Sequence, residues 1–501
     1  MINKSIGADH STASFWKFLG FFLVGMLGKM TGALLSHSPI FTGFLNYKDW
    51  ECISKKCTDL MTNFTGEPVE FYTRDTICEN ALKPHVDFNW TINRTSYALE
   101  WGLICSDESK WSNLKSFFFI GAFIGVAVGT ALYDRIGRKM TTLIAVSIAI
   151  ISCLATTFVN SYRIMLIMRV IHGIGTFATI AGLELLSVEF TPTNLRNLCQ
   201  VVSACLWTLG SFCAIGVSYG VKKWQNIFLV QGFVMCATAI AIIVYPESPR
   251  FQLVKGKEKE ARTTFRRVSK IFKTEEITEK VDLTYSDYNQ NYLDQVKDFK
   301  KYPVMLRNTL LLMVSWTMLS CISYGLLFSW SKLGSDIYSS IFFSSLGSFI
   351  SKGSGMTYFT IQYFGRRNSL VINFAGIGIL FFIAAACFGV HIAGTWTLDQ
   401  VVCLCSVLFI SGTWSSLVLL SKELSPTSHR GMILCLCSAV ARLGAIAGPY
   451  LALLYNRINP RMVLSIFGGM AALSSFLAYF NSDSTGKPIP STPEDLVNSK
   501  T

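Results

Sequence analysis

Two stretches of the chain, SVEFTPTNLR at residues 187–196 and SKELSPTSHR at residues 421–430, share the pattern S-x-E-x-x-P-T-x-x-R. We call the sequence distance from Ser187 to Ser421 the repeat offset. A second pair, DRIGRK at residues 134–139 and QYFGRR at residues 362–367, recurs at nearly the same distance. Because each of the four stretches follows a long apolar segment, one unit occurs twice in the chain. The repeat predicts two similar helical bundles related by an axis along a membrane normal.

The composition places both units in a membrane. Of the 501 residues, 51% are hydrophobic and only 15% are charged, whereas about a quarter of the residues of a soluble protein are charged. The net charge of +13 does not indicate nucleic-acid binding, because no basic run is interleaved with stacking aromatic residues. We therefore predict an all-α polytopic membrane protein without a nucleic-acid partner.

Twelve segments are apolar enough to cross a hydrocarbon core about 30 Å thick as helices of about 20 residues. They lie near residues 15–36, 113–133, 141–159, 163–187, 197–219, 226–245, 305–330, 336–361, 368–390, 398–421, 431–455 and 460–480. The predicted domains are a cytoplasmic N-terminus at 1–14, a six-helix bundle at 15–245, a cytoplasmic loop at 246–304, a second six-helix bundle at 305–480 and a disordered cytoplasmic tail at 481–501. Within the cytoplasmic loop, apolar residues spaced by three and four predict an amphipathic helix from Ala261 to Phe272.

The hydrophilic stretch 37–112 has the chemistry of an extracellular loop. Its three sequon asparagines are Asn63, Asn89 and Asn93, and its four cysteines are Cys52, Cys57, Cys78 and Cys105. Both features suit an oxidising, glycosylating compartment. Four cysteines allow three disulfide pairings, and the spacing does not choose among them. With this loop outside, both termini lie in the cytoplasm of a plasma-membrane protein.

Charged residues recur at the predicted cytoplasmic ends of the spans. They are Asp134, Arg135, Arg138, Glu189, Arg196, Arg366, Arg367, Glu423 and Arg430. Carboxylate–guanidinium pairs at helix ends can form and break while partly hydrated, so these residues predict a latch that closes the cytoplasmic side between two rocking bundles. The alternative is that the arginines only anchor helix ends at the lipid headgroups.

Three cations lie deep in predicted spans, where each costs about 2.5–3.5 kcal/mol on insertion scales. Arg442 is about 16 Å along its helix, Lys352 has a similar depth, and Lys29 lies somewhat further out. If Glu184 pairs with Arg169, the spans do not hold enough acidic residues to neutralise Arg442, Lys352 and Lys29. We predict that they face a central aqueous cavity and bind an organic anion, with Arg442 holding a carboxylate or sulfate in bidentate fashion.

Aromatic side chains are expected to form the apolar walls of that cavity. In the seventh span, Trp316, Tyr324 and Phe328 are spaced so that they lie near one face of a helix. Tyr358 in the eighth span and Trp414 in the tenth are further candidates. The alternative for each residue is ordinary packing between helices.

The motifs resemble the major facilitator superfamily. Those that carry the resemblance are Gly129 followed by DRIGRK at 134–139, and Arg169 followed by Gly173. The end of the first loop, WGLICSDESKW at 101–111, together with EFTPTNLR at 189–196 and PESPR at 246–250, more narrowly resembles the organic cation/anion/carnitine transporter family. The second copy of the first motif departs from the family pattern, because Gln362 and Tyr363 stand where Asp and Arg are expected.

The resemblance also implies the charge of the substrate. Arg442 stands seven residues before Pro449, at a place where relatives that carry organic cations have Asp and relatives that carry organic anions have Arg. Lys352 resembles a basic residue of the eighth span in anion carriers. Tyr324 lies in a Ser-Tyr-Gly segment that resembles an aromatic segment of the family's seventh span.

The sequence favours a secondary transporter that moves amphipathic organic anions across the plasma membrane by alternating access, as an exchanger or a facilitator. The chain contains no G-x-x-x-x-G-K-[ST] loop, which argues against a primary pump. The alternatives are a carrier of organic cations or carnitine-like zwitterions, and a transporter-like receptor without turnover. We expect a small organic anion and the lipid bilayer as partners, and neither enzymatic activity nor a cofactor or metal, because no nucleophile–base or metal-ligand spacing occurs. The oligomeric state stays open.

Overall fold

The computed structural model describes residues 30, 33, 96–101, 103, 108–191, 196–221, 223–272, 292–333, 337–353, 356–393, 396–426, 429–457, 459–485, 490 and 493–494. Within these residues, ten helices are long and apolar enough to cross a membrane. They confirm ten of the twelve predicted spans. The predicted first span lies outside the described residues, apart from Met30 and Ala33.

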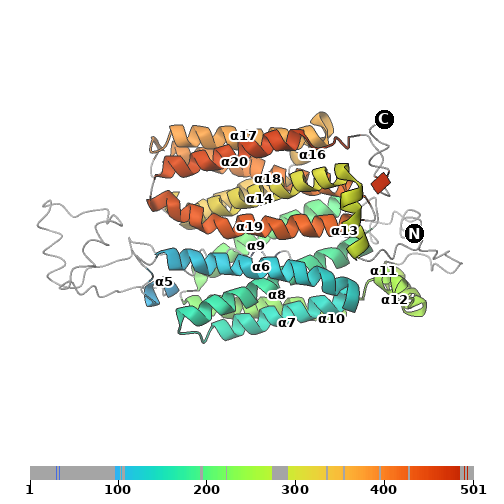
Figure 1. Cartoon of the computed structure of the whole chain (residues 1–501). Helices are drawn as coiled ribbons and strands as arrows, with labels where there is room; N and C mark the ends of the chain where they lie inside the picture. Colours follow the sequence, from blue (N-terminus) through green and yellow to red (C-terminus); the bar gives the residue numbers. More distant parts are fainter. Residues whose placement is uncertain are drawn as a thin grey trace, which may run out of the picture.

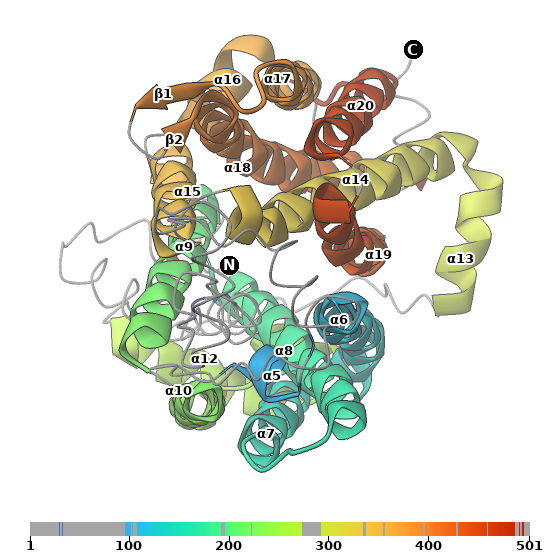
Figure 2. The ribbon, with the colours of Figure 1, turned by 90° about the vertical axis from the view of Figure 1, so that its left-hand side faces the viewer.

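The helices form two groups that follow the two halves of the chain. The N-terminal half contains α5 (Tyr97–Glu100), α6 (Glu108–Ile136), α7 (Arg138–Thr156), α8 (Tyr162–Phe190), α9 (Arg196–Gly220) and α10 (Trp224–Val244). The C-terminal half contains α14 (Pro303–Leu333), α15 (Ile337–Gly353), α16 (Met356–Phe364), α17 (Arg366–Ala386), α18 (Leu398–Leu424), α19 (Arg430–Arg457) and α20 (Pro460–Tyr479). Seen along the helices, the two groups occupy opposite sides of the molecule (Figure 2).

Two elements of the C-terminal half differ in detail from the sequence prediction. The predicted eighth span consists of α15 and α16, and residues 354–355 between them lie outside the described part of the chain. The predicted ninth span ends four residues early, at Ala386, and strands β1 (His391–Ala393) and β2 (Trp396–Thr397) form a small antiparallel hairpin before α18. The Gln400 side chain accepts the backbone N–H of Thr397 at 3.2 Å, which helps to fix the start of α18.

The internal repeat predicted from the sequence is present in the packing. A Cβ on Gly210 would lie 2.1 Å from the Met30 carbonyl oxygen, and a Cβ on Gly444, which follows Gly210 at the repeat offset, would lie 2.1 Å from the Thr317 carbonyl oxygen. Only glycine therefore allows α9 to cross the Met30 segment and α19 to cross α14 so closely. Residues at the repeat offset make equivalent helix crossings in both halves.

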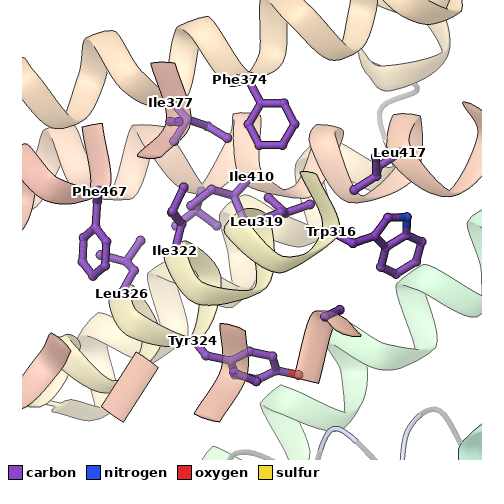
Figure 3. Packing of buried hydrophobic residues seen from close by; sticks show 14 of the residues in the cluster. Trp316, Leu319, Ile322, Tyr324, Leu326, Phe374, Ile377, Ile410, Leu417 and Phe467 are labelled. Atoms are coloured by element: carbon purple, nitrogen blue, oxygen red, sulfur yellow. The ribbon is translucent and has the colours of Figure 1, made fainter. Parts of the chain in front are cut away.

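Apolar residues both fill the interior and cover the outside of the helices. In the C-terminal half, Phe374, Ile377 and Phe467 pack against α14 in a dry cluster (Figure 3). On the outer surface, Ile151 and Phe233 are 66% and 63% exposed. Large apolar side chains in that position indicate contact with lipid rather than water.

The described residues of the charged linker between the halves include three helices at one end of the bundles, α11 (Pro249–Val254), α12 (Glu258–Phe272) and α13 (Tyr292–Lys301) (Figure 1). Helix α12 coincides with the predicted amphipathic helix. Helix α13 contacts the C-terminal half where Asp298 Oδ2 lies 3.2 Å from His429 Nε2. At the same end, Ser484, which the sequence places in a disordered tail, donates a hydrogen bond to a Glu423 carboxylate oxygen at 2.6 Å.

Candidate functional site

Helices α6 and α19 join the two halves across their boundary. Near one end, the Ser116 hydroxyl donates to the Ile446 carbonyl oxygen at 2.9 Å. Near the other end, the Thr130 hydroxyl donates to Cys435 Sγ at 3.1 Å. The two helices are therefore in contact at both the predicted extracellular and the predicted cytoplasmic level.

Arg442 lies in the middle of α19, on the side that faces this boundary. Its Cζ is 4.4 Å from the ring centroid of Phe177, which belongs to α8 of the other half. The guanidinium also interacts with the side chain of Tyr324 in α14. Arg442 Nε is buried without a hydrogen-bond partner, and no ion pair involves Arg442 within the described residues. A buried donor in this state is costly unless a further acceptor satisfies it.

Phe177 and Tyr324 belong to a group of four neighbouring aromatic rings, and we call Phe119, Phe177, Tyr324 and Phe328 the central aromatic cluster. The Tyr324 ring is 4.5 Å from Phe119, and Phe119 is 6.3 Å from Phe328 and 6.4 Å from Phe177. Figure 3 shows Tyr324 pointing away from the dry cluster around Phe374. The sequence predicted Tyr324 and Phe328, but it could not single out Phe119 and Phe177, which are ordinary apolar residues of their spans.

Trp316 and Trp414 form a separate pair inside the C-terminal half. Their rings are 5.5 Å apart and nearly perpendicular. The Trp316 indole donates to Ser421 Oγ at 3.0 Å, and the Trp414 indole donates to Ser323 Oγ at 3.0 Å. Trp316 therefore packs inside the C-terminal half, about 80° around α14 from Tyr324, since eight residues of an α-helix turn by that angle.

Lys352 lies at the other boundary between the halves, where α15 meets α9. Its Nζ donates to the Thr208 hydroxyl at 3.3 Å. Thr208 and Arg442 are related by the repeat offset. Lys352 therefore contacts α9 at the position that corresponds, by the repeat, to the position of Arg442 in α19. Lys29 and the side chain of Tyr358 lie outside the described part of the chain.

Lys115 is a buried cation that sequence reasoning missed. It is 3% exposed, and its Nζ lies 3.5 Å from the ring centroid of Trp111 and 4.6 Å from that of Phe328. Contacts of this kind stabilise a cation that has left water. Because Lys115 stands only two residues inside the predicted span 113–133, its position alone resembled that of a helix-end anchor.

Arg169 does not pair with Glu184, the alternative that the sequence left open. Both residues lie on α8, 15 residues apart, which separates them by about 22 Å along the helix. Arg169 is 1% exposed; its guanidinium lies 4.7 Å from the ring centroid of Phe228 and interacts with the Tyr97 side chain. It therefore ties the end of the first loop to the N-terminal half and does not reach the boundary.

The predicted gate residues of the N-terminal half form a cluster around Arg138. Its guanidinium lies 3.1 Å from Asp134 Oδ1 and 3.3 Å from Glu189 Oε1. Glu247, which the sequence showed only as part of a motif, accepts the backbone N–H groups of Arg138 and Lys139, each at 3.1 Å. A carboxylate at the N-terminus of α7 is stabilised by the helix dipole.

The C-terminal half repeats the main pair of this cluster. Arg366 Nε lies 3.1 Å from Glu423 Oε1, and these two residues correspond to Arg138 and Glu189 in the two repeated motifs. The pair forms although Gln362 and Tyr363 replace the expected Asp and Arg, since the tail hydroxyl described above supports Glu423 instead.

Each of the remaining predicted gate residues has a different environment. Arg430 donates to the Ser425 carbonyl oxygen at 3.4 Å, and the Arg367 guanidinium lies 5.0 Å from the Tyr479 ring centroid. Arg135 is exposed, and the Arg196 side chain lies outside the described residues.

The ion pairs of the predicted gate that join two described residues each lie within one of the two helical bundles. Every ion pair between described residues of the bundles joins side chains of the same half. These pairs therefore position helix ends within a half. A latch formed directly between the bundles stays a prediction.

Gly137 in this cluster offers a direct test of the local packing. It has φ +121°, and a Cβ there would lie 2.7 Å from Glu247 Oε2. We expect Gly137→Ala to lower the stability by about 1–3 kcal/mol for the backbone strain, and further because the new Cβ would press against the Glu247 carboxylate. Gly256→Ala is the matched control, since Gly256 also has positive φ (+72°) but no atom within 4 Å of its Cβ position. Thermal unfolding of the solubilised protein measures both; equal losses would contradict the role of Glu247.

The predicted extracellular features lie outside the described residues. They are Asn63, Asn89, Asn93, Cys52, Cys57, Cys78 and Cys105. The described end of this loop packs against the N-terminal half, where Trp224 donates to a Glu100 carboxylate oxygen at 2.6 Å and contacts the Tyr97 and Trp101 rings. The signature at the end of the loop thus has a structural role in fixing the loop to α10.

Comparisons with known proteins identify the class to which this arrangement belongs. The structure superimposes on the inward-open xylose transporter XylE of E. coli with a TM-score of 0.63 and 15% identity, covering 96% of this chain and 99% of the other. This likeness shows the fold of a major facilitator superfamily transporter.

Residues 61–485 match the family described as "Sugar (and other) transporter", and the chain belongs to that family. It is 26% identical over 428 residues to organic anion transporter 3 of Sus scrofa, covering 83% of this chain and 77% of the relative. It is 23% identical over 430 residues to organic cation/carnitine transporter 2 of Homo sapiens, covering 83% and 74%. The resemblance stated from the motifs is confirmed: the protein is a multi-pass secondary transporter and not an enzyme.

Proposed function

We propose that the protein carries amphipathic organic anions across the plasma membrane by alternating access, as an exchanger or a facilitator. The observation that carries this proposal is Arg442. Its guanidinium lies at the boundary between the halves, bordered by Phe177 and Tyr324, with Nε lacking an acceptor among the described residues. A carboxylate or sulfate would supply that acceptor, and the central aromatic cluster would contact the apolar part of the same molecule.

The positions of the other cations support an anionic substrate. Lys352 and Lys115 lie at contacts between the halves, one against Thr208 and one against Phe328. Positive charges in a low-dielectric site attract an anion from both openings of the transporter. The names of the relatives include both anion and cation carriers, so the sign of the substrate is the point to test.

An uptake screen tests the proposed function. The full-length protein is expressed in oocytes and offered labelled carboxylates, sulfate conjugates, carnitine-like zwitterions and quaternary amines. We expect saturable uptake of the first two classes, and faster uptake when an anion is preloaded if the protein is an exchanger. Uptake restricted to quaternary amines or zwitterions would favour the cation or carnitine carrier, and saturable binding without flux would favour the receptor.

Replacement of Lys352 tests whether the second cation contributes. We expect Lys352→Gln to raise the KM for an anion about tenfold, because removal of one charge several ångströms from the substrate costs on the order of 1–2 kcal/mol. Thr208→Val is the matched control, since it removes only the hydroxyl that accepts from Lys352 and leaves the charge in place. A KM that changes equally in both variants would show that the contact matters and the charge does not.

The orientation is part of the proposal. We propose that the loop 37–112 is extracellular and glycosylated, and that α11, α12 and α13 lie in the cytoplasm. Glycosidase treatment of intact cells measures this directly. We expect a mobility shift that disappears when Asn63, Asn89 and Asn93 are replaced together, and a persistent shift would contradict these sites.

A further inference from the structure

A groove runs along the outer face of the C-terminal half between α17 and α20. Its volume is about 410 Å³, and its lining is almost entirely apolar. Its lining combines small residues, Ala375, Gly378 and Ala472, with large ones, Ile379, Phe382 and Phe476. Since both helices lie at the periphery of the molecule (Figures 1 and 2), the groove belongs to the surface that meets lipid, away from the boundary between the halves.

The dimensions of the groove match one leaflet of a bilayer. Along α17 its lining extends from Val371 to Phe382, which is about 16 Å of helix. Half of a hydrocarbon core about 30 Å thick is nearly the same length. At the cytoplasmic end, Ser475 Oγ donates to the Val371 carbonyl oxygen at 2.9 Å and holds the two helices together.

A positive charge lies at the cytoplasmic end of the groove. The Arg367 guanidinium is 5.0 Å from the ring centroid of Tyr479, which lines the groove, and its Nε donates to Asn368 Oδ1 at 3.4 Å. Asp483 also faces Arg367. The neighbouring Arg366 pairs with Glu423.

Arg307 also contacts the segment that follows α20, where its guanidinium donates to Ser482 Oγ at 3.4 Å. Three arginines, Arg307, Arg366 and Arg367, therefore stand against the two carboxylates of Glu423 and Asp483. Among these five described residues, the positive charges exceed the negative ones by one, at the end where the apolar groove begins.

We propose that this groove binds one acyl chain of an anionic phospholipid from the leaflet on the side of α12 and α13, with its phosphate at Arg367. The apolar lining and the length of the groove fit a single extended chain. The net positive charge at its end is complementary to an anionic headgroup. This site is separate from the proposed anion pathway, and the test below measures lipid and not transport.

The experiment uses the full-length protein in nanodiscs that contain equal amounts of phosphatidylcholine and phosphatidylserine. After release into detergent, native mass spectrometry counts the lipids that remain bound. We expect one retained phospholipid, enriched in the anionic type. Arg367→Gln is expected to reduce retention of the anionic lipid about fivefold, the factor for one basic side chain near a membrane surface.

Matched variants separate the groove from general lipid contact. Arg461→Gln removes an exposed arginine at the opposite end of α20 and should leave retention unchanged. Ala472→Phe fills the groove and should abolish retention of either lipid, whereas Ile240→Phe, at a position 64% exposed on α10, should not. Size-exclusion profiles identify a variant that fails to fold, and the Arg367 pair then decides the outcome alone.

Several results would overturn the proposal. These are retention without preference for the anionic lipid, equal retention by Arg367→Gln and Arg461→Gln, or unchanged retention in a folded Ala472→Phe variant.

Discussion

Arg442→Asp is expected to reduce uptake of an organic anion about a hundredfold or more, to the background of cells without the protein. The substitution removes a charge-assisted bidentate contact and places a negative charge against the substrate. Each of these effects costs on the order of 1.5–3 kcal/mol. Initial rates of labelled-anion uptake, normalised to the amount of protein at the cell surface, measure the effect.

Two milder variants show which property of Arg442 matters. Arg442→Lys keeps the charge but loses the planar fork, so we expect an intermediate loss. Tyr324→Phe removes only the hydroxyl that interacts with the guanidinium and should cost less than either change at Arg442. Undiminished anion uptake by Arg442→Asp, or a wild-type protein that carries only cations, would refute the charge argument.

The sequence predicted the fold well because a membrane leaves strong signals. Long apolar segments and a repeated motif are visible without a structure, and the packing of Gly210 and Gly444 follows the repeat offset. Arg442 was predictable for a related reason: an ionisable residue in the middle of an apolar span is costly and therefore stands out.

The partners of these residues could not be predicted in the same way. Phe119 and Phe177 look like any other apolar residues of a span, and only the helix crossings bring them to Arg442 and Tyr324. Asp134, Glu189 and Glu423 were among the predicted gate residues, but the sequence did not show which arginine each of them contacts. Charge spacing along the sequence does not reveal whether Arg138 reaches a carboxylate of its own half or of the other.

The pairing within each half also changes the interpretation of the gate. Arg138–Glu189 and Arg366–Glu423 are equivalent by the repeat, so each half carries its own ion pair that can stay intact while the halves move as units. The contacts that must change during transport are then those across the boundary. Among the described residues, Thr130 and Cys435 form such a contact near the predicted cytoplasmic end.

Thr130→Cys is therefore expected to allow a disulfide with the native Cys435 that stops transport. The Thr130 hydroxyl and Cys435 Sγ are 3.1 Å apart, so a sulfur in place of that oxygen needs to move by only about 1 Å to reach the S–S bond length of about 2.05 Å. A disulfide here would hold α6 and α19 together, and the cytoplasmic side could not open. After treatment with a mild oxidant, we expect anion uptake to fall to background and a reductant to restore it.

Three controls separate the effect of this disulfide from other effects of oxidation. Thr130→Ser with the oxidant keeps the hydroxyl and should transport normally, and Thr130→Cys combined with Cys435→Ser lacks the second thiol and should be insensitive. The wild-type protein treated with the same reductant shows whether reduction of cysteines in the loop 37–112 changes anion uptake by itself. If a cross-linked protein, identified by mass spectrometry, still carried anions at the normal rate, α6 and α19 would not need to separate at this end, and transport by rocking of two rigid halves would be refuted.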